Sequence, residues 1–325
     1  MLSRVADSIY WMSRYLERAD NLARFVDVTH HMSLDLPPGS SQQWEALVFA
    51  SGDQEYFNER YGDATRENVL RFLTFDNKYL GSILSCVQAA RENARSVRES
   101  ISSEMWEQIN QVYLTVREAS QSGDLESPNE FLHYVKNSNH LFVGITVTTF
   151  SQGEAWHFAR LGRVLERADK TSRILDVKYF TLLPNVQDVG TPIDDLQWSA
   201  VLRSVSGFEM YRKRHHGITP KRVVGFLVLD RQFPRAIMHC LDIATRSLHA
   251  ISGSPEGTFW NEADKRLGQL RSDLAYSTVD EIISKGLHEF LDTLQVKLNE
   301  VGDAIHETFI AIEPPAEGGV TSAMF

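Results

Sequence analysis

The sequence predicts an all-α protein on three observations: helical spacing of apolar residues, prolines confined to joints, and a charged string that occurs twice. Ile83, Cys86, Ala90 and Ala94 recur at steps of three and four residues, which places them on one face of a helix. No run of alternating β-branched residues indicates a strand. The ten prolines stand between the periodic segments and separate the helices.

The charged string predicts an internal duplication. Residues 13–28 (SRYLERADNLARFVDV) match residues 162–177 (GRVLERADKTSRILDV) at nine of sixteen positions. Further matches at an offset of 154 are Trp44 with Trp198, Cys86 with Cys240, and Trp106 with Trp260. This self-similarity predicts a tandem duplication of a helical-bundle unit of roughly 150 residues. We expect the two halves to pack about a pseudo-twofold axis, as homodimer subunits do, with the paired residues buried in equivalent places. The charged segments 13–28 and 162–177 are expected to lie near one another, close to this axis.

Each copy is predicted to contain four or five helices in the same order. They are the charged helix, a helix led by Trp44 or Trp198, a helix that leads to the cysteine, a helix around Trp106 or Trp260, and a closing helix. Two short strings, S-P-N-E at 127–130 and S-P-E at 254–256, are typical of helix starts. The closing helix of the first copy, at about 129–151, leads into the charged helix of the second.

These elements define the predicted organisation of the chain. The first helical repeat covers residues 1–128, and the second covers 129–313 and includes the linking helix. A flexible tail follows at 314–325. The offset between the copies rises from 149 to 154, which predicts a five-residue insertion within residues 184–192.

Composition and charge narrow the class of protein. The formal charge of −10 argues against a general affinity for nucleic acid, which needs basic surface. The two cysteines lie on apolar helix faces, where they are expected as small buried side chains of a reducing compartment. No stretch approaches the ~20 apolar residues of a membrane span, and the first twelve residues do not form a signal peptide. We therefore predict a cytoplasmic protein with no membrane partner.

The repeated Glu-Arg helix is the first candidate site. Arg14, Glu17 and Arg18 lie on one side of it, opposite an apolar face, and Glu17 is expected within reach of Arg14, three residues away. Three interpretations remain open: a salt-bridged face in solvent, a buried ion-pair network that joins the halves, or a pocket for a charged ligand. Arginine suits the last two, because its guanidinium binds carboxylate or phosphate bidentately. The candidate catalytic residues are Glu17 and Glu166, and the candidate binding residues are Arg14, Arg18, Arg163 and Arg167.

The second candidate site consists of polar residues that the two copies do not share, since shared positions are better explained by the fold. In the string AARENARSVR (89–98), Arg91, Arg95 and Arg98 are expected to form one stripe. The second copy has LDRQFPR (229–235) where the first has FDNKYLG. The candidate ligand- or partner-binding residues of this set are Arg91, Glu92, Asn93, Arg95, Arg231 and Arg235. A solvated helix face is the alternative for the arginine stripe.

Motifs for cofactors are missing from the sequence. Three carboxylate-x-x-His pairs have the spacing used by helical di-metal bundles, but so short a pattern arises by chance, and we predict no metal site. No phosphate-binding glycine loop and no nucleophile motif occurs. We therefore expect no cofactor on this chain.

Four strings resemble the bacterial alpha-E domain family: residues 1–20, 90–110, 156–169 and 233–237. The resemblance covers nearly the whole chain, and the Glu-Arg motif that gives the family part of its name is Glu17-Arg18 and Glu166-Arg167 here. Ala236 stands where the family more often has serine. Members of this family are typically encoded with a circularly permuted ATP-grasp protein, and often with a transglutaminase-like protease. The resemblance therefore implies an ATP-dependent system that forms peptide or amide bonds, with ATP bound on the partner protein.

Three functional hypotheses follow. The first is a helical accessory or co-catalytic partner of the ATP-grasp ligase, which the missing nucleotide motif favours. The second is a stand-alone enzyme that uses Glu17 or Glu166 as acid or base and holds a carboxylate or phosphate substrate with arginines. A carboxylate flanked by arginines should have a lowered pKa, which makes it a poor acid and a weak base. The third is a structural scaffold. A transglutaminase-like protein and a second copy of the chain are further candidate partners.

Overall fold

The fold is known from a computed structural model that describes residues 1–34, 42–123, 128–181 and 192–311. These residues form helices and connecting loops with no strand, so the predicted all-α class is confirmed. The predicted insertion before Pro192 and the predicted tail at 314–325 lie outside the described residues.

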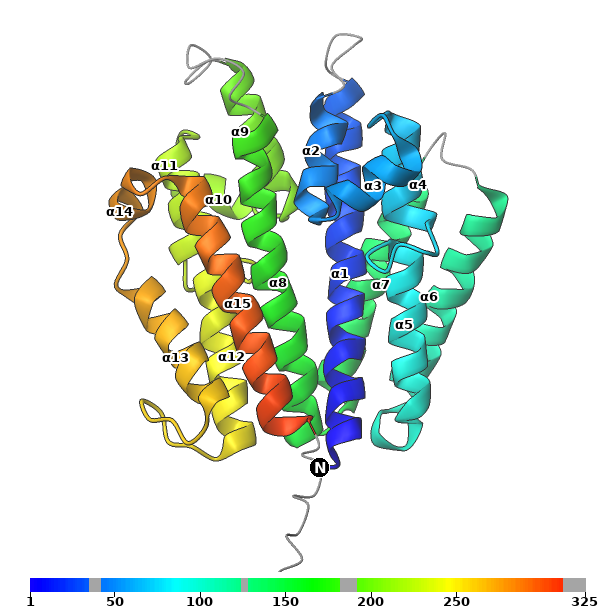
Figure 1. The fold of residues 1–325 in the computed structure, drawn as a ribbon, viewed down its shortest axis with the longest axis vertical. Coiled ribbons are helices and arrows are strands. Elements are labelled where there is room, and N and C mark those ends of the chain that lie inside the picture. The colour runs from blue at the N-terminus through cyan, green and yellow to red at the C-terminus, as the bar shows by residue number, and fades with distance from the viewer. Residues whose placement is uncertain (35–41, 124–127, 182–191, 312–325) are drawn as a thin grey trace, which may run out of the picture.

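Two long helices run side by side through the middle of the molecule (Figure 1). They are α1 (Ser3–Leu34) and α8 (Glu154–Thr181), and they carry the two charged strings. Their close approach depends on Gly162, because a Cβ atom at this position would lie 2.4 Å from the carbonyl oxygen of Tyr10. The predicted proximity of the Glu-Arg helices is therefore confirmed.

A bundle of three further helices packs beside α1. It consists of α5 (Ile83–Ser96), α6 (Ser103–Ser122) and α7 (Asn129–Thr149), with the short 3-10 helix η1 (Arg98–Ser100) after α5. Both α5 and α7 contact α1, and α6 lies against α5 and α7. Three shorter helices cover one end of this bundle: α2 (Gln42–Ser51), α3 (Gln54–Tyr61) and α4 (Arg66–Phe75). Of these, α2 also contacts α8.

A second bundle packs beside α8. It consists of α12 (Ile237–Ser252), α13 (Glu262–Ala275) and α15 (Leu287–Phe309). Its shorter helices are α9 (Pro192–Ser204), α10 (Phe208–Arg214), α11 (Pro220–Val224) with the π-helix η3 (Gly225–Leu229), and α14 (Val279–Ser284). Both α12 and α15 contact α8, and α13 lies against them. The apolar core runs through both bundles.

Two loops, one in each bundle, have the same local structure. The side chain of Asp76 accepts backbone N–H bonds from the second and third residues after it, and Arg60 lies 3.7 Å away. The side chain of Asp230 accepts the corresponding two bonds and pairs with Arg214. A carboxylate held by backbone amides fixes the turn that leads into the following helix. These turns set the position of the loops that precede α5 and α12.

The aromatic and cysteine matches are only partly equivalent in burial. Trp44 and Trp198 are both buried, and so are the free thiols of the two cysteines. Trp106 is half-buried, whereas Trp260 is 67% exposed, so the predicted equivalence is wrong for this pair. The reason is the longer connection before α13, which begins two residues after Trp260, while α6 begins three residues before Trp106.

One of the two predicted helix starts is confirmed, because α7 begins directly after Pro128, and the other is wrong. Ser254-Pro255 does not begin a helix; α13 begins at Glu262, where the Asn261 side chain accepts the N–H of Asp264. Ser82 caps α5 by accepting the N–H of Ser85. Ala236 precedes α12 and cannot make this bond, which is the structural meaning of the departure from serine noted above.

Candidate functional site

Two reciprocal ion pairs join α1 to α8. Arg18 donates to Glu166 through Nε at 2.6 Å and through Nη2 at 3.0 Å. Arg167 donates to Glu17 through the same two atoms at 2.7 and 2.8 Å. Each glutamate is therefore held bidentately by an arginine of the opposite helix, which is the strong form of this interaction. A contact of Glu17 with Arg14, expected from their spacing on one helix, is not formed; Arg14 donates to Glu166 at 2.9 Å.

A third arginine completes the site around Glu17. Arg235 comes from the loop before α12 and lies 3.3 Å from Glu17 Oε1 through Nη1. The same nitrogen donates to Asn21 at 2.9 Å, and Nη2 donates to Asp20 at 2.5 Å. Asp20 also accepts from Arg24 at 2.9 Å. Arg235 was predicted as a binding residue, and the structure places its charge among the carboxylates of α1.

The site around Glu166 takes its further cation from a different element. Lys170 Nζ lies 3.7 Å from Glu166 Oε1 and 3.0 Å from Asp169 Oδ2. Arg173 also pairs with Asp169, at 3.1 Å. The position that matches Arg235 at the offset of 154 is Gly81, which has no side chain to contribute. A lysine of α8 therefore supplies the charge that a loop arginine supplies at Glu17.

We call this group of residues the buried charge network. It contains eight cations and four carboxylates, an excess of four positive charges, and its members are Arg14, Arg18, Arg24, Arg163, Arg167, Lys170, Arg173, Arg235, Glu17, Asp20, Glu166 and Asp169. In the described part of the chain Arg163 makes no ion pair, and burial and neighbouring Arg167 lower its pKa to about 10. The buried-network interpretation is thus confirmed for the Glu-Arg motifs, and a solvated face is wrong.

Both glutamates of the motif are ionised and buried away from solvent. Each has 0% of its surface exposed. Burial raises the pKa of Glu17, but the guanidinium groups of Arg167 and Arg235 outweigh it and hold the pKa well below its usual range. Glu166 is held low in the same way by Arg18, Arg14 and Lys170. A carboxylate in this state does not donate a proton near neutral pH and is a weak base.

Acid should unfold the protein through these carboxylates. The folded-state pKa values of Glu17, Glu166 and Asp169 lie below their unfolded values of about 4.5 for Glu and 3.8 for Asp. Their stabilisation is therefore complete above the unfolded pKa and is lost as the pH falls toward the folded pKa. Urea unfolding from pH 7 to pH 3 should give a constant free energy of unfolding above pH ~5.5 and a steep fall below pH ~4.5. A flat profile down to pH 3 would show that the network does not stabilise the fold.

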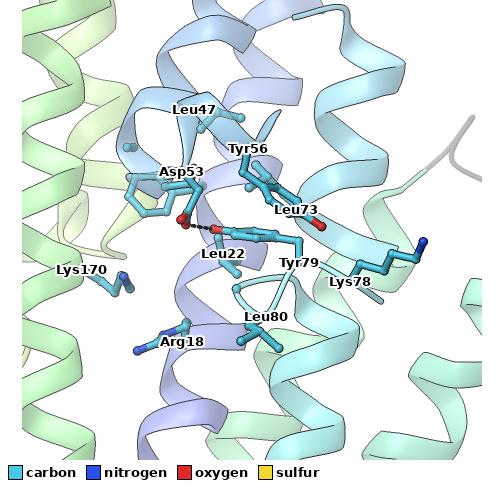
Figure 2. A pocket seen from close by; sticks show the side chains of 14 residues that line it. Arg18, Leu22, Leu47, Asp53, Tyr56, Leu73, Lys78, Tyr79, Leu80 and Lys170 are labelled. Carbon is cyan, nitrogen blue, oxygen red and sulfur yellow. Dashed lines mark hydrogen bonds between the residues drawn. The ribbon is translucent and has the colours of Figure 1, made fainter. Parts of the chain in front are cut away.

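A pocket of about 370 Å³ opens beside the network, where α1, α2 and the loop before α5 meet. Arg18 and Lys170 belong to both the network and the pocket. Figure 2 shows them on one side of the pocket, with Asp53 and Tyr79 on the other. The Tyr79 hydroxyl donates to Asp53 Oδ2 at 2.8 Å. Leucines line the remaining wall: Leu22, Leu47, Leu73 and Leu80. The charge network thus borders a largely apolar pocket through Arg18 and Lys170.

Sequence reasoning missed most of this pocket. Of its residues only Arg18 was a candidate; Lys170, Asp53 and Tyr79 were not. The available signal was the difference between the copies. At the offsets of 149 and 154 the matching residues are Asn21, Gly207 and Phe233, none of which carries the charge or hydroxyl of its counterpart.

The arginine stripe of the second candidate site is split. Because α5 ends at Ser96, Arg98 lies in η1, and its guanidinium lies 4.7 Å from the ring centre of Trp106. Arg91 lies 5.7 Å from the same ring and donates to Asn110 at 2.8 Å. Arg95 extends into solvent with 64% of its side chain exposed.

The remaining candidates of this set make local contacts. Glu92 pairs with Arg91 and Arg95, each at 2.8 Å, and Asn93 donates to the carbonyl of Ala89. Arg231 lies 3.9 Å from Asp242 at the surface. The structure therefore brings neither the arginine stripe nor Arg231 into contact with Glu17 or Glu166.

Two general properties of the described residues bear on the site. Within them, no group of three or more His, Cys, Asp or Glu side chains could hold a metal ion. None of the described helices combines the length and apolar character that crossing a membrane requires.

Comparisons with known proteins agree with the resemblance found in the sequence. A family model described as "a predicted alpha-helical domain with a conserved ER motif" matches residues 1–310. An uncharacterized protein of Mycobacterium bovis and two of Mycobacterium tuberculosis are each 22% identical over 337 residues, which cover 95% of this chain and 37% of the relative. The chain thus spans little more than a third of the length of the curated relatives it matches. No solved structure matches it. The chain belongs to the Alpha-E family.

Proposed function

We propose that the chain is a helical accessory or co-catalytic partner of a circularly permuted ATP-grasp ligase in an ATP-dependent system that forms peptide or amide bonds. The observation that carries the proposal is the burial of Glu17 and Glu166, each neutralised by arginines of the opposite helix. The Glu-Arg motif in this state holds two helices together and leaves the chemistry to another protein. The sequence has no phosphate-binding loop, so the ligase would supply the ATP site.

The length of the relatives also supports a joint function. The mycobacterial proteins match this chain over 37% of their length, so this unit occurs there beside other segments. A cytoplasmic location and a transglutaminase-like protein as a further partner belong to the same proposal.

We further propose that the chain is a tandem duplication with halves related by a pseudo-twofold axis. Support comes from the matched helix order and from the shared turns at Asp76 and Asp230. The sequence predicted a boundary between residues 128 and 129. However, α7 contacts α1 and α6 just as α15 contacts α8 and α13, which favours a boundary between α7 and α8.

The two alternative functions have weaker support. A stand-alone enzyme with Glu17 or Glu166 as acid or base would need substrate access to a carboxylate that is 0% exposed. A purely structural scaffold leaves the charged pocket beside Arg18 and Lys170 without a use.

The test is reconstitution with the ATP-grasp protein encoded beside this chain. The two proteins should co-purify, and ATP turnover by the ligase on a panel of amino acids should rise when this chain is added. If the chain alone consumes a substrate, the enzyme hypothesis replaces the accessory role. If the ligase works equally well without it, the accessory role is wrong.

Arg95→Glu should weaken this association and leave folding intact. The side chain is 64% exposed, and within the described residues its ion-pair partner is Glu92. Exposed charges mainly steer and orient binding. Surface substitutions usually change stability by no more than about 0.5 kcal/mol. Affinity for the ligase and the melting temperature should be measured together. Arg212→Glu, an exposed arginine on α10, is the matched control and should bind normally. Equal losses in both variants would remove the arginine stripe as a docking surface.

A further inference from the structure

We propose that the pocket between α1, α2 and the loop before α5 binds a free α-amino acid with an apolar side chain. This names the substrate class of the accessory role above, and in that sense rests on it. Binding itself requires only this chain, so it can be tested without the ligase.

Arg18 and Lys170 form the subsite for the carboxylate. Arg18 donates to Glu166 through Nε and Nη2, and within the described residues its Nη1 makes no hydrogen bond. Among the described residues, two carboxylate oxygens lie within 4 Å of Lys170 Nζ, at 3.0 and 3.7 Å, so the ammonium group keeps donor capacity. Around this point four cations, Arg14, Arg18, Lys170 and Arg173, face the two carboxylates Glu166 and Asp169. The excess positive charge favours an anion.

Asp53 forms the subsite for the ammonium group. It precedes α3 but does not cap that helix. Tyr79 donates to its Oδ2, and in the described part of the chain Oδ1 accepts no hydrogen bond and no cation pairs with the carboxylate. A pocket that holds Arg18 and Lys170 opposite one unpaired carboxylate matches a zwitterion better than a simple anion, which Asp53 would repel.

Tyr79 holds Asp53 in this position, and Gly81 makes room for Tyr79. A Cβ atom at residue 81 would lie 2.3 Å from Tyr79 Oη, so any other residue would displace the ring. The tyrosine stays protonated, because burial and the Asp53 carboxylate raise its pKa. It therefore remains a donor to Asp53 at neutral pH.

The apolar wall of the pocket would contact the side chain of the bound amino acid. Leu22, Leu47 and Leu73 line it, and so does Ala50 on α2. Its volume of about 370 Å³ lies in the range of small-molecule sites, roughly 300–1,000 Å³. Burial of an aliphatic side chain against these leucines would add affinity that glycine cannot obtain.

The matching positions in the second bundle carry different side chains. Gly81, Tyr79 and Asp53 correspond to Arg235, Phe233 and Gly207. A Cβ atom at Gly207 would lie 2.9 Å from the Phe233 ring, which places these two residues together as Asp53 and Tyr79 are. The loop position that is Gly81 beside the pocket is thus filled by Arg235, whose guanidinium is buried on Asp20 and Asn21.

Calorimetric titration of the full chain with four probes tests the proposal. L-leucine has both charges, N-acetyl-L-leucine keeps only the carboxylate, L-leucinamide keeps only the ammonium group, and glycine lacks the side chain. Leucine should bind at least about tenfold more tightly than each of the other three probes, because each of those three lacks one of the sets of contacts that leucine makes. Equal binding of leucine and N-acetyl-leucine would overturn the zwitterion site in favour of an anion site.

Four variants assign the contacts. Asp53→Asn should weaken the binding of leucine by about tenfold or more and should not weaken the binding of N-acetyl-leucine, because the substitution removes a charge that repels this anion. Lys170→Met should weaken the binding of leucine and of N-acetyl-leucine and leave the binding of leucinamide unchanged. Ala50→Leu fills the pocket and should abolish binding of leucine. Lys136→Met is the matched control: Lys136 has the same 13% exposure as Lys170 and pairs with an aspartate at 2.8 Å, but lies outside the pocket.

Circular dichroism and melting temperature separate loss of binding from loss of fold. If Lys136→Met weakens leucine as much as Lys170→Met does, or if Ala50→Leu still binds, the pocket is not the site. If wild-type protein binds none of the probes yet stimulates the ligase, this inference is overturned and the accessory role stands. If leucine binds as described and the ligase is unaffected, the accessory role fails and the amino-acid site stands.

Discussion

Glu17→Gln is expected to lower the free energy of unfolding by roughly 3–5 kcal/mol, which is the cost of breaking a buried ion pair by removing one partner. Glu17 is 0% exposed and accepts from both Arg167 and Arg235. The amide keeps the shape of the side chain but removes its charge, so Arg167 loses its bidentate carboxylate and Arg235 keeps its pair with Asp20 but loses the second carboxylate. An excess of positive charge already exists at this place, which adds to the effect.

Urea denaturation at pH 7 should measure this change, with Glu300→Gln as the control. Glu300 pairs with Arg266 at 2.8 Å, but both side chains are substantially exposed. The same substitution should therefore cost no more than about 1 kcal/mol there. Similar small losses in both variants would mean that the Glu17 pair contributes no more than a surface pair. Normal stability with loss of ligase-dependent turnover would instead favour a catalytic role for Glu17.

Gly162→Ala should have the second large effect and lower the free energy of unfolding by about 1–3 kcal/mol through overpacking. The added Cβ would lie 2.4 Å from the Tyr10 carbonyl oxygen and 3.0 Å from its ring. A backbone atom cannot rotate away, so α8 must move from α1, and the Arg14–Glu166 and Arg18–Glu166 bonds must lengthen.

Gly144→Ala on α7 is the control with the opposite sign. A Cβ atom at Gly144 meets nothing within 4 Å, and alanine in a helix is about 0.8–1 kcal/mol more favourable than glycine. Thermal melts of the two variants should therefore move in opposite directions. An unchanged or raised melting temperature for Gly162→Ala would show that the two central helices are not packed as closely as described.

The fold class and the packing of the two Glu-Arg helices against each other could be predicted from the sequence, because both follow from patterns within the chain. Helical spacing shows which side chains share a face, and the repeat shows which segments match. Neither the helical spacing nor the repeat shows which residue a charged side chain pairs with. Spacing suggested Glu17 with Arg14, whereas packing against α8 brought the better-aligned Arg167 and Arg235 to Glu17.

Helix boundaries limited the rest of the prediction. The arginine stripe assumed one helix through Arg98, but α5 ends at Ser96 and the third arginine turns onto Trp106. The match of Trp260 to Trp106 assumed connections of equal length. The pocket was missed for a third reason: it depends on Gly81, whose importance lies in an absent side chain, and no pattern of charged residues marks such a position.

The buried charge network divides the molecule into a basic interior and an acidic shell. It holds four excess positive charges, and the whole chain carries −10, so all other residues together carry −14. A solute farther away than the Debye length, about 10 Å at 0.1 M salt, experiences little of either field. A closer one meets the negative shell over most of the surface, and inside the pocket it meets Arg18 and Lys170 of the positive interior. Added salt should therefore speed the entry of an anion such as N-acetyl-leucine, while the entry rate of a zwitterion, which has no net charge, should hardly change.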